Sequence, residues 1–329
     1  MEHYHVPVML EEALEALSVK RGGVYVDATL GGCGHSLAIL GRLSELGGGS
    51  LFAIDRDAEA IAHARAVLEG DAAVSEALRR GVVSMEIIKG NFADMAGLSE
   101  RLKETGADGV LMDLGVSSHQ LDTPERGFSF RSDAELDMRM DPDGDGPSAA
   151  ELIAQASERE LFEIIRDYGE ERFARRIASA ICEAARTAPI RTTARLAEIV
   201  SGAVPKYHPP RGGKAIHPAT RTFQALRIAC NRELEALRSG LQTAFELLRP
   251  QGRLAVISYH SLEDRIVKRF CKEKLGRCTC SPDMPICVCG AEASLRELTR
   301  KPLLPSAGEV ADNPRARSAK LRVCEKLHK

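Results

Sequence analysis

Three carboxylates in this sequence are well placed to do chemistry, because each follows a short apolar run typical of a buried strand. They are Asp27, Asp55 and Asp113. The carboxyl ends of parallel strands meet at one edge of a sheet, where open α/β sheets bind nucleotides, so we expect the three side chains to face one crevice. After Asp27 comes a glycine-rich stretch, Gly31-Gly-Cys-Gly-His35, and then a helical pattern. A glycine turn before a helix brings backbone N–H groups close to a ligand.

The residue types at this turn limit the class of ligand that it can bind. No Lys follows the glycines, as a phosphate-binding P-loop requires, and the spacing does not match G-x-G-x-x-G. Carboxylates would repel a pyrophosphate, which disfavours an NAD-dependent oxidoreductase. S-adenosylmethionine fits better, because its sulfonium and ammonium groups are cationic. We expect Asp55 to accept from the ribose hydroxyls, Phe92 to lie against the adenine and Asp27 to lie near the methionine end. Asp55 has an alternative role as the cap of the next helix.

Alternating strand and helix patterns through residue 115 predict an α/β fold with a doubly wound parallel sheet. The predicted strands are 24–27, 49–55, 82–92 and 108–115, and the helices are 7–17, 36–42, 58–68 and 99–105. The sheet is then interrupted by a long loop, 116–147, and by four helical patterns: 149–155, 158–167, 170–185 and 193–200. The sheet domain resumes with helix 221–248, strand 252–258 and helix 263–275. It ends in a hairpin of 295–303 with 318–327. We therefore expect a discontinuous domain, 1–115 and 214–329, and an insertion, 116–213.

The charge distribution points to a polyanionic partner. Residues 1–199 hold 21 Lys and Arg against 35 Asp and Glu, whereas residues 200–329 hold 24 against 12. Such an excess of cations in the C-terminal part predicts a basic surface, although the two halves could simply neutralise each other. There is no secretory signal and no apolar run long enough to span a membrane, and scattered cysteines suit a reducing compartment, so we expect a cytoplasmic protein.

Four cysteines form two Cys-x-Cys pairs. They are Cys278, Cys280, Cys287 and Cys289. Four thiolates suffice to hold one Zn²⁺, but structural zinc sites usually have two to four residues between paired cysteines. The alternatives are a redox-labile loop or packed thiols.

Motifs along the whole chain resemble those of one family. They are His5-Val-Pro-Val8, Asp27-Ala-Thr-Leu-Gly-Gly-Cys-Gly-His35, Ala53-Ile-Asp-Arg-Asp57, Asp113-Leu-Gly-Val-Ser-Ser118, Gln120-Leu-Asp122, Glu125-Arg-Gly-Phe-Ser-Phe130, Leu136-Asp-Met-Arg-Met140, His217-Pro-Ala-Thr-Arg-Thr-Phe-Gln-Ala-Leu-Arg227, Ser258-Tyr-His-Ser-Leu-Glu-Asp-Arg-Ile266 and Asn313-Pro-Arg-Ala-Arg-Ser-Ala-Lys-Leu-Arg322. With them the chain resembles the bacterial ribosomal RNA small subunit methyltransferase H family, also called MraW. The resemblance implies a class I S-adenosylmethionine-dependent methyltransferase, a Rossmann-like sheet with an inserted all-helical domain. It also implies methyl transfer to the N4 amine of a cytidine in the decoding region of 16S rRNA.

The family's cofactor contacts carry over to matching positions here. They are Cys33, Gly34, His35, Asp55, Phe92, Asp113 and Gln120. Position 33 departs from the pattern, because the family commonly has Gly there. If the backbone at this position has a positive φ, Cys costs on the order of 1 kcal/mol of strain.

The cytosine N4 amine is a poor nucleophile, so methyl transfer needs a proton acceptor and a base held outside its stack. The position after the fourth strand lacks the Pro-Pro-aromatic sequence of many amine methyltransferases. We expect Asp113 to accept a hydrogen bond from the cofactor or the target amine, and Phe128 or Phe130 to supply a stacking face. Tyr259 and His260 are second candidates for catalysis, and His260 has an equally good alternative as a supporting hydrogen-bonding group.

Four arginines are candidates for RNA contact: Arg221, Arg227, Arg315 and Arg317. The alternative for the first two is internal ion pairing. The proposed partner is 16S rRNA or the small ribosomal subunit, and the sequence does not decide between a monomer and a homodimer. Competing functions are DNA cytosine-N4 methylation, a non-catalytic RNA-binding ribosome assembly factor and a zinc-dependent interaction module.

Overall fold

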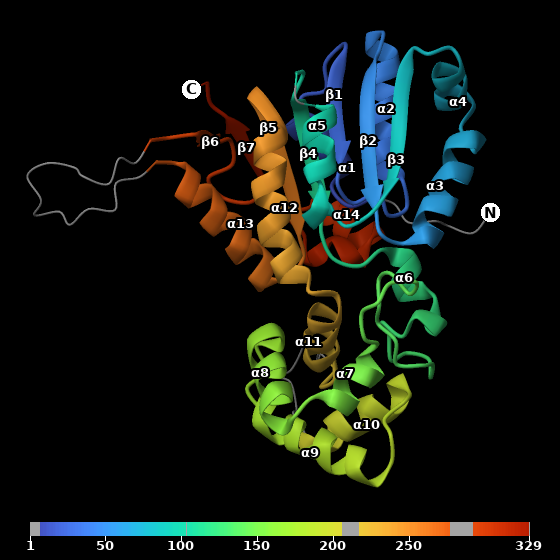
Figure 1. Cartoon of the computed structure of the whole chain (residues 1–329), viewed down its shortest axis with the longest axis vertical. Helices are drawn as coiled ribbons and strands as arrows, with labels where there is room; N and C mark the ends of the chain where they lie inside the picture. Colours follow the sequence, from blue (N-terminus) through green and yellow to red (C-terminus); the bar gives the residue numbers. More distant parts are fainter. Residues whose placement is uncertain (1–6, 103, 206–216, 277–291, 329) are drawn as a thin grey trace, which may run out of the picture. The chain divides into compact units, whose positions relative to one another are not determined.

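The computed structural model describes residues 7–102, 104–205, 217–276 and 292–328 (Figure 1). The chain divides into two compact units. Met1–Gly115 and Leu234–Lys329 form the first, here called the sheet unit, and Val116–Glu233 form the second, here called the helical unit.

The sheet unit contains a seven-stranded sheet in the order β3-β2-β1-β4-β5-β7-β6. The strands are β1 (Gly23–Asp27), β2 (Gly49–Asp55), β3 (Val83–Lys89), β4 (Ala107–Asp113), β5 (Leu248–Ser258), β6 (Leu295–Glu297) and β7 (Lys320–Lys326). The first five pair in parallel, and β7 pairs antiparallel with both β5 and β6. The predicted α/β class and the antiparallel C-terminal hairpin are confirmed.

Helices cover both faces of the sheet (Figure 1). One face packs with α1 (Leu10–Leu17), α2 (Gly34–Leu46), α3 (Ala58–Gly70) and α4 (Ala72–Arg79), and the other packs with α5 (Ala96–Arg101), α12 (Glu233–Leu247) and α13 (Ser261–Lys274). In β4, Leu111 belongs to the first core, whereas Val110 and Met112 belong to the second. Successive side chains of a strand point to opposite faces, so a strand buried on both sides must be apolar throughout. A short helix, α14 (Ala307–Asp312), precedes β7.

The helical unit has its own apolar core. Its helices are α6 (Ser118–Asp122), α7 (Ala149–Gln155), α8 (Glu158–Gly169), α9 (Ala174–Thr187), α10 (Thr193–Ala203) and α11 (Thr220–Asn231). Leu161, Ile165, Ile177 and Ile181 are fully buried in this core. The loop predicted for 116–147 is largely irregular, but hydrogen bonds hold it to α11. The Asn231 side chain donates to the Met138 carbonyl and accepts from the Met140 N–H.

The helix expected over 221–248 is wrong as a single element. Arg232 has a φ of 50°, which ends α11, and α12 begins at the next residue. A left-handed residue is a common way to end a helix, here at some strain because the residue is not glycine. The same device at Glu170, with a φ of 46°, ends α8, so α9 begins at Ala174 and not at the predicted 170. The helical unit accordingly extends to Glu233, beyond the boundary at 213 expected from the sequence.

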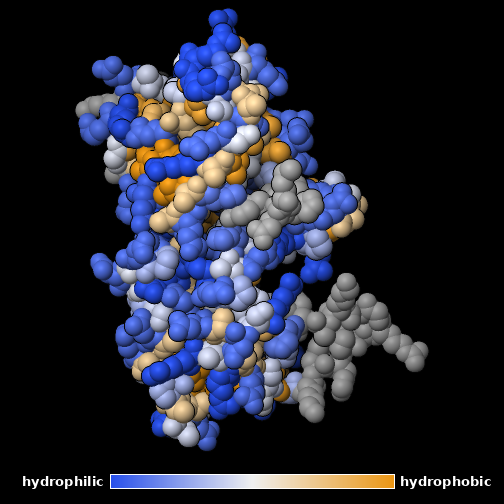
Figure 2. All heavy atoms as spheres, turned by 90° about the vertical axis from the view of Figure 1, so that its right-hand side faces the viewer, coloured by the Kyte–Doolittle hydropathy of each residue, from blue (hydrophilic) through white to orange (hydrophobic). Residues whose placement is uncertain are grey.

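Hydrophilic residues dominate the face shown in Figure 2, and hydrophobic residues gather in its upper part. Within the described ranges, every helix is too short or too polar to cross a membrane.

Candidate active site

The three strand-end carboxylates lie around one loop, residues 28–33. The loop joins neighbouring strands, because Ala28 donates to the Leu111 carbonyl and Leu30 donates to the Ile54 carbonyl, both at 2.9 Å. Each carboxylate-bearing residue is bonded to this loop: the Thr29 N–H donates to Asp27 at 3.1 Å, the Gly31 N–H donates to Asp55 at 2.8 Å and the Asp113 N–H donates to the Thr29 hydroxyl at 2.7 Å. The strand ends of β1, β2 and β4 therefore meet at a single point of the sheet edge.

Asp27 holds this loop against α2. Its side chain is buried, and the Ser36 hydroxyl donates to it at 2.6 Å. Burial raises the pKa of this carboxyl above its ordinary value, against the hydrogen bonds that lower it. The cofactor contact expected of Asp27 stays a prediction; in the structure its two oxygens accept from Thr29 and Ser36.

Asp55 connects the end of β2 to the glycine loop. Besides Gly31, it accepts from the Asp57 N–H at 2.9 Å, and burial raises its pKa. The alternative role of Asp55 as the cap of the next helix is wrong, because Asp57 is the cap of α3 and accepts from the Glu59 N–H at 3.0 Å. Asp55 therefore lies beside the glycine loop at the end of β2, and its contact with a ribose stays a prediction.

The loop ends in a strained residue. Cys33 has a φ of 68° and a ψ of 0°, a left-handed conformation, and its side chain is fully buried. Burial raises the pKa of its thiol to about 12. The next residue, Gly34, allows a close approach, because a Cβ there would lie 2.8 Å from the Pro7 Cγ. The N-terminus of α2 has no side-chain cap, which leaves its first N–H groups for another acceptor.

Asp113 is the centre of a polar cluster. The Tyr259 hydroxyl donates to its Oδ1 at 2.8 Å, and His35 Nδ1 lies 3.8 Å from its Oδ2. Burial raises the pKa of this carboxyl from 3.8 to about 6, although His35 and the Tyr259 hydrogen bond act to lower it. The Nε2 of His35 lies 3.1 Å from the Val8 carbonyl, which can only accept. His35 therefore carries a proton on Nδ1, facing Asp113, only in its imidazolium form.

Tyr259 and His260 follow β5, and each is hydrogen-bonded to a nearby carboxylate. Burial and the nearby Asp113 raise the pKa of the Tyr259 phenol well above its ordinary value. A phenol that stays protonated is a donor, which agrees with the hydrogen bond from Tyr259 to Asp113. His260 forms a capping box with Glu263 at the start of α13, at 3.5 Å and 3.2 Å. This geometry favours the alternative for His260, a supporting hydrogen-bonding group.

Phe92 lies in the short helix Phe92–Asp94 and packs against α12. A Cβ on Gly240 would lie 2.6 Å from the Phe92 ring, so the glycine makes room for the aromatic side chain. The ring is half-buried and fixed beside the sheet. Its contact with adenine stays a prediction.

The helical unit holds the remaining predicted residues of the cofactor and base contacts. Gln120 is buried and closes a capping box with Ser117 at 3.1 Å and 3.2 Å. Phe128 is only 7% exposed and belongs to the apolar core, so the structure does not offer it as a stacking face. Phe130 is half-buried, with its ring centroid 4.5 Å from that of His217 and 4.8 Å from that of Phe223.

The arginines expected to contact RNA differ in their surroundings. Arg227 donates twice to the Glu233 carboxylate, at 2.8 Å and 2.9 Å, and both side chains are largely buried, so internal ion pairing is correct for it. Arg221 is half-exposed, donates to the Glu170 carbonyl at 3.1 Å and lies 3.9 Å from the Glu171 carboxylate, so it also has an internal ion pair. In the sheet unit, Arg315 and Arg317 lie on the short helix Pro314–Ser318, where Arg317 is exposed.

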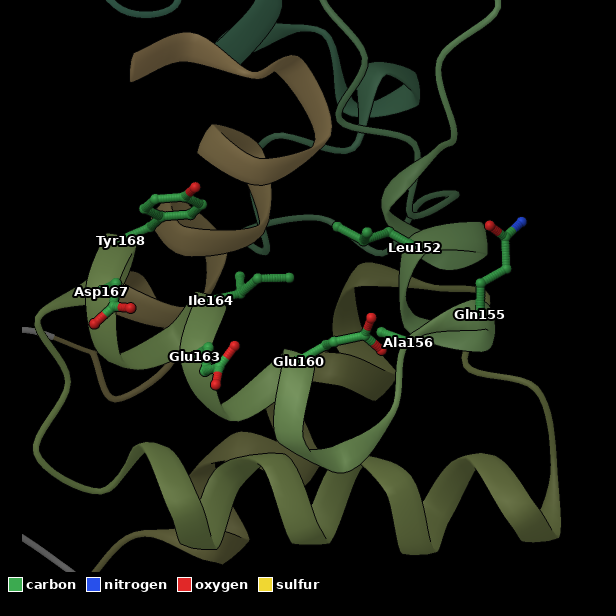
Figure 3. A pocket seen from close by; sticks show the side chains of 8 residues that line it. All are labelled: Leu152, Gln155, Ala156, Glu160, Glu163, Ile164, Asp167 and Tyr168. Atoms are coloured by element: carbon green, nitrogen blue, oxygen red, sulfur yellow. The ribbon is translucent and has the colours of Figure 1, made fainter. Parts of the chain in front are cut away.

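A pocket of about 560 Å³ in the helical unit contains none of the predicted site residues (Figure 3). Leu152, Gln155 and Ala156 line one side, and Glu160, Glu163, Ile164, Asp167 and Tyr168 of α8 line the other. Its three carboxylates already bond to Ser157, Arg159 and Arg166. The proposed zinc ligands Cys278, Cys280, Cys287 and Cys289 lie outside the described residues.

The family model and the similar protein sequences indicate one family. The family model described as the MraW methylase family matches residues 2–327. Two similar proteins are each called ribosomal RNA small subunit methyltransferase H. The protein from Geobacter sulfurreducens is 51% identical, over 99% of this chain and 100% of its own length. The protein from Pelobacter propionicus is 50% identical, over 98% of each chain. Among solved structures, a putative rRNA-methylase from Clostridium thermocellum is 15% identical, with a TM-score of 0.42 over 98% of this chain and 100% of its own.

Proposed function

The chain belongs to the MraW methylase family, and from this we propose that it methylates the N4 amine of a cytidine in the decoding region of 16S rRNA. It is an S-adenosylmethionine-dependent methyltransferase, and the names of its relatives support ribosomal RNA of the small subunit as the substrate. The observation that carries the proposal is the Asp113–Tyr259 hydrogen bond at the carboxyl ends of β4 and β5.

The residues at the sheet edge fit S-adenosylmethionine. Burial raises the pKa values of Asp27, Asp55 and Asp113, because it disfavours their charged forms. A cationic ligand beside them would stabilise the charged carboxylates. Asp55 would hold the ribose, Phe92 the adenine and the uncapped start of α2 the carboxylate of the methionine part. Gly34 and His35 border that start, and Gln120 is proposed as a further contact from the family pattern. When bound, the cofactor supplies an electrophilic methyl group on a sulfonium.

Asp113 is the group that we propose to take the proton. The bound cofactor would supply the methyl group to N4, and the electron pair of the broken carbon–sulfur bond would stay on sulfur. The amine must then lose one proton, and the Asp113 carboxylate receives it. A pKa of about 6 leaves this carboxylate ionised near neutral pH while keeping it basic enough to accept. Tyr259 fixes its orientation, because the phenol donates to Oδ1.

RNA binding is proposed for three of the four arginines. Arg221 is half-exposed, Arg317 is exposed, and Arg315 lies on the same short helix as Arg317. Phe130 is the proposed stacking residue of the pair considered from the sequence. The zinc site remains a separate proposal, which metal analysis of the purified protein tests.

The test uses methyl-labelled S-adenosylmethionine with small ribosomal subunits from cells that lack this protein. Nucleoside mass spectrometry should find N4-methylcytidine in 16S rRNA, and Asp113→Ala should abolish it while calorimetry still detects cofactor binding. Full activity of Asp113→Ala would remove this residue from the role. Labelling of duplex DNA instead would favour a DNA cytosine-N4 methyltransferase, and a failure to bind the cofactor would favour a non-catalytic assembly factor.

A further inference from the structure

The exposed side of α13 carries a line of cations. Arg265, Lys268, Arg269 and Lys272 are all exposed and are spaced three, four and seven residues from the first. Residues with this spacing lie on one side of a helix, and at 1.5 Å per residue they span about 10 Å along it. We call these four residues the α13 stripe.

The opposite side of α13 faces the sheet. Val267, Phe270 and Cys271 are buried in the core that α13 shares with α5 and α12. Lys274 also points to this side, because its Nζ lies 5.1 Å from the centre of the Phe245 ring and 5.7 Å from that of Phe270. The burial pattern therefore fixes the α13 stripe on the outside of the helix.

The acidic residues of α13 do not cancel the stripe. Glu263 is buried and accepts from the Tyr259 N–H at 2.8 Å. Asp264 pairs with Arg322 at 2.6 Å and with Lys320 at 3.5 Å, both on β7. Glu273 pairs with Arg269 of the stripe at 2.9 Å. Two of the three carboxylates are thus used within the fold, and the outer side of α13 is cationic.

The position of α13 links this surface to the candidate active site. The helix begins two residues after Tyr259, whose hydroxyl donates to Asp113. Arg265 follows the first helical residue, Ser261, by about one turn, or roughly 6 Å. A nucleotide with its base at Asp113 is attached on both sides to phosphates, which must pass along the elements that surround the strand ends.

We propose that the α13 stripe binds the phosphate backbone of the RNA that flanks the target cytidine. This inference rests on the proposed function, because it takes RNA as the substrate. Regularly spaced cations on an exposed helix offer charge without base-specific contacts, so the stripe would contribute affinity and not the choice of base.

The test measures RNA affinity against salt concentration without cofactor. The probe is a fluorescein-labelled 20-nucleotide oligocytidylate, and the variant replaces Arg265, Lys268, Arg269 and Lys272 with glutamine. Each phosphate contact on a single strand contributes about 0.7 to the slope of log affinity against log salt, so loss of four should reduce the slope by roughly 2 to 3. Affinity in 100 mM salt should fall about 100- to 1000-fold, and the two proteins should converge near 1 M salt.

A matched control removes the same charge from the acidic half of the sheet unit. It replaces the exposed residues Arg42, Arg65, Arg79 and Arg80 with glutamine. This control should keep the wild-type slope, as should a variant that exchanges Lys and Arg within the stripe. An unchanged slope in the stripe variant, or an equal loss in the control, would overturn the proposal.

Methylation separates this inference from the proposed function. With small ribosomal subunits, the stripe variant should show a raised KM and an unchanged kcat, with unchanged cofactor affinity. Absence of methylation by the wild-type protein would count against the proposed function, whereas the salt slope would still decide whether the stripe binds RNA. If the fourfold variant fails to fold, Lys268→Gln with Lys272→Gln should still reduce the slope by about 1.4, and no reduction would reject the proposal.

Discussion

Replacing Asp113 with asparagine is expected to stabilise the protein and to abolish methyl transfer. The carboxylate is held in a largely buried position, with 19% of its side chain exposed, and its pKa is raised from 3.8 to about 6. About two pKa units correspond to about 3 kcal/mol, the free energy by which burial disfavours the charged form. The groups facing it are Tyr259, His35, Asp27 and Glu263.

The sign of the pH dependence follows from proton binding. Between pH 4 and 6 the folded protein holds a proton on Asp113 that the unfolded chain has lost, so stability falls as the pH rises through this range. Above pH 6 the penalty is complete. Asp113→Asn removes it, so the variant should exceed the wild type by up to about 3 kcal/mol at pH 8 and by roughly half of that at pH 5.

Urea unfolding at pH 5 and pH 8 measures this difference, and single-turnover methylation of small subunits measures the chemistry. The exposed carboxylate Asp312 provides the control, because Asp312→Asn should change neither quantity. An Asp113→Asn variant that is no more stable than the wild type at pH 8, or equally stabilised at both pH values, would refute the reasoning from burial. Retained methylation would refute the assignment of the proton acceptor.

Three further predictions test individual residues. Tyr259→Phe removes the donor to Asp113, so the apparent pKa of activity should rise above about 6 while kcat at high pH persists; an unshifted pH profile would contradict this. Cys33 has a φ of 68°, so the free energy of unfolding in urea should be about 1 kcal/mol larger for Cys33→Gly than for Cys33→Ala. A Cys33→Ala variant as stable as Cys33→Gly would show that the backbone is not strained there. Arg221→Gln should lower the RNA salt slope by about 0.7, whereas Arg227→Gln should leave it unchanged and cost about 3 kcal/mol of stability by leaving Glu233 unpaired.

Local sequence patterns suffice to predict the sheet and the ends of its strands. Strands β1, β2 and β4 are five to seven residues long, and each is a short apolar run that ends on Asp27, Asp55 or Asp113. This pattern specifies both the strand and the position of the acid, because burial and strand termination depend on neighbouring residues. The departure at Cys33 also follows from the sequence, since the residue type alone raises the question of a positive φ.

Helix breaks were harder to predict, because no glycine or proline marks them. Arg232 and Glu170 adopt left-handed conformations that their residue types do not favour. The helices on either side pack their own apolar faces, α11 against α8 within the helical unit, and this packing outweighs local preference.

The order of residue types is enough to show which chemical groups stand at the strand ends and that the C-terminal part has an excess of cations. Only the fold shows how these groups are used. Tyr259 donates to Asp113, 146 residues away in the chain, and Arg227 forms an ion pair with Glu233. Phe128 is buried, whereas Phe130 is half-buried. The physical reason is that burial and hydrogen bonding are properties of neighbours in space. A residue's type fixes its donors, acceptors and charge, but its pKa and its partners are set by side chains that the fold brings beside it.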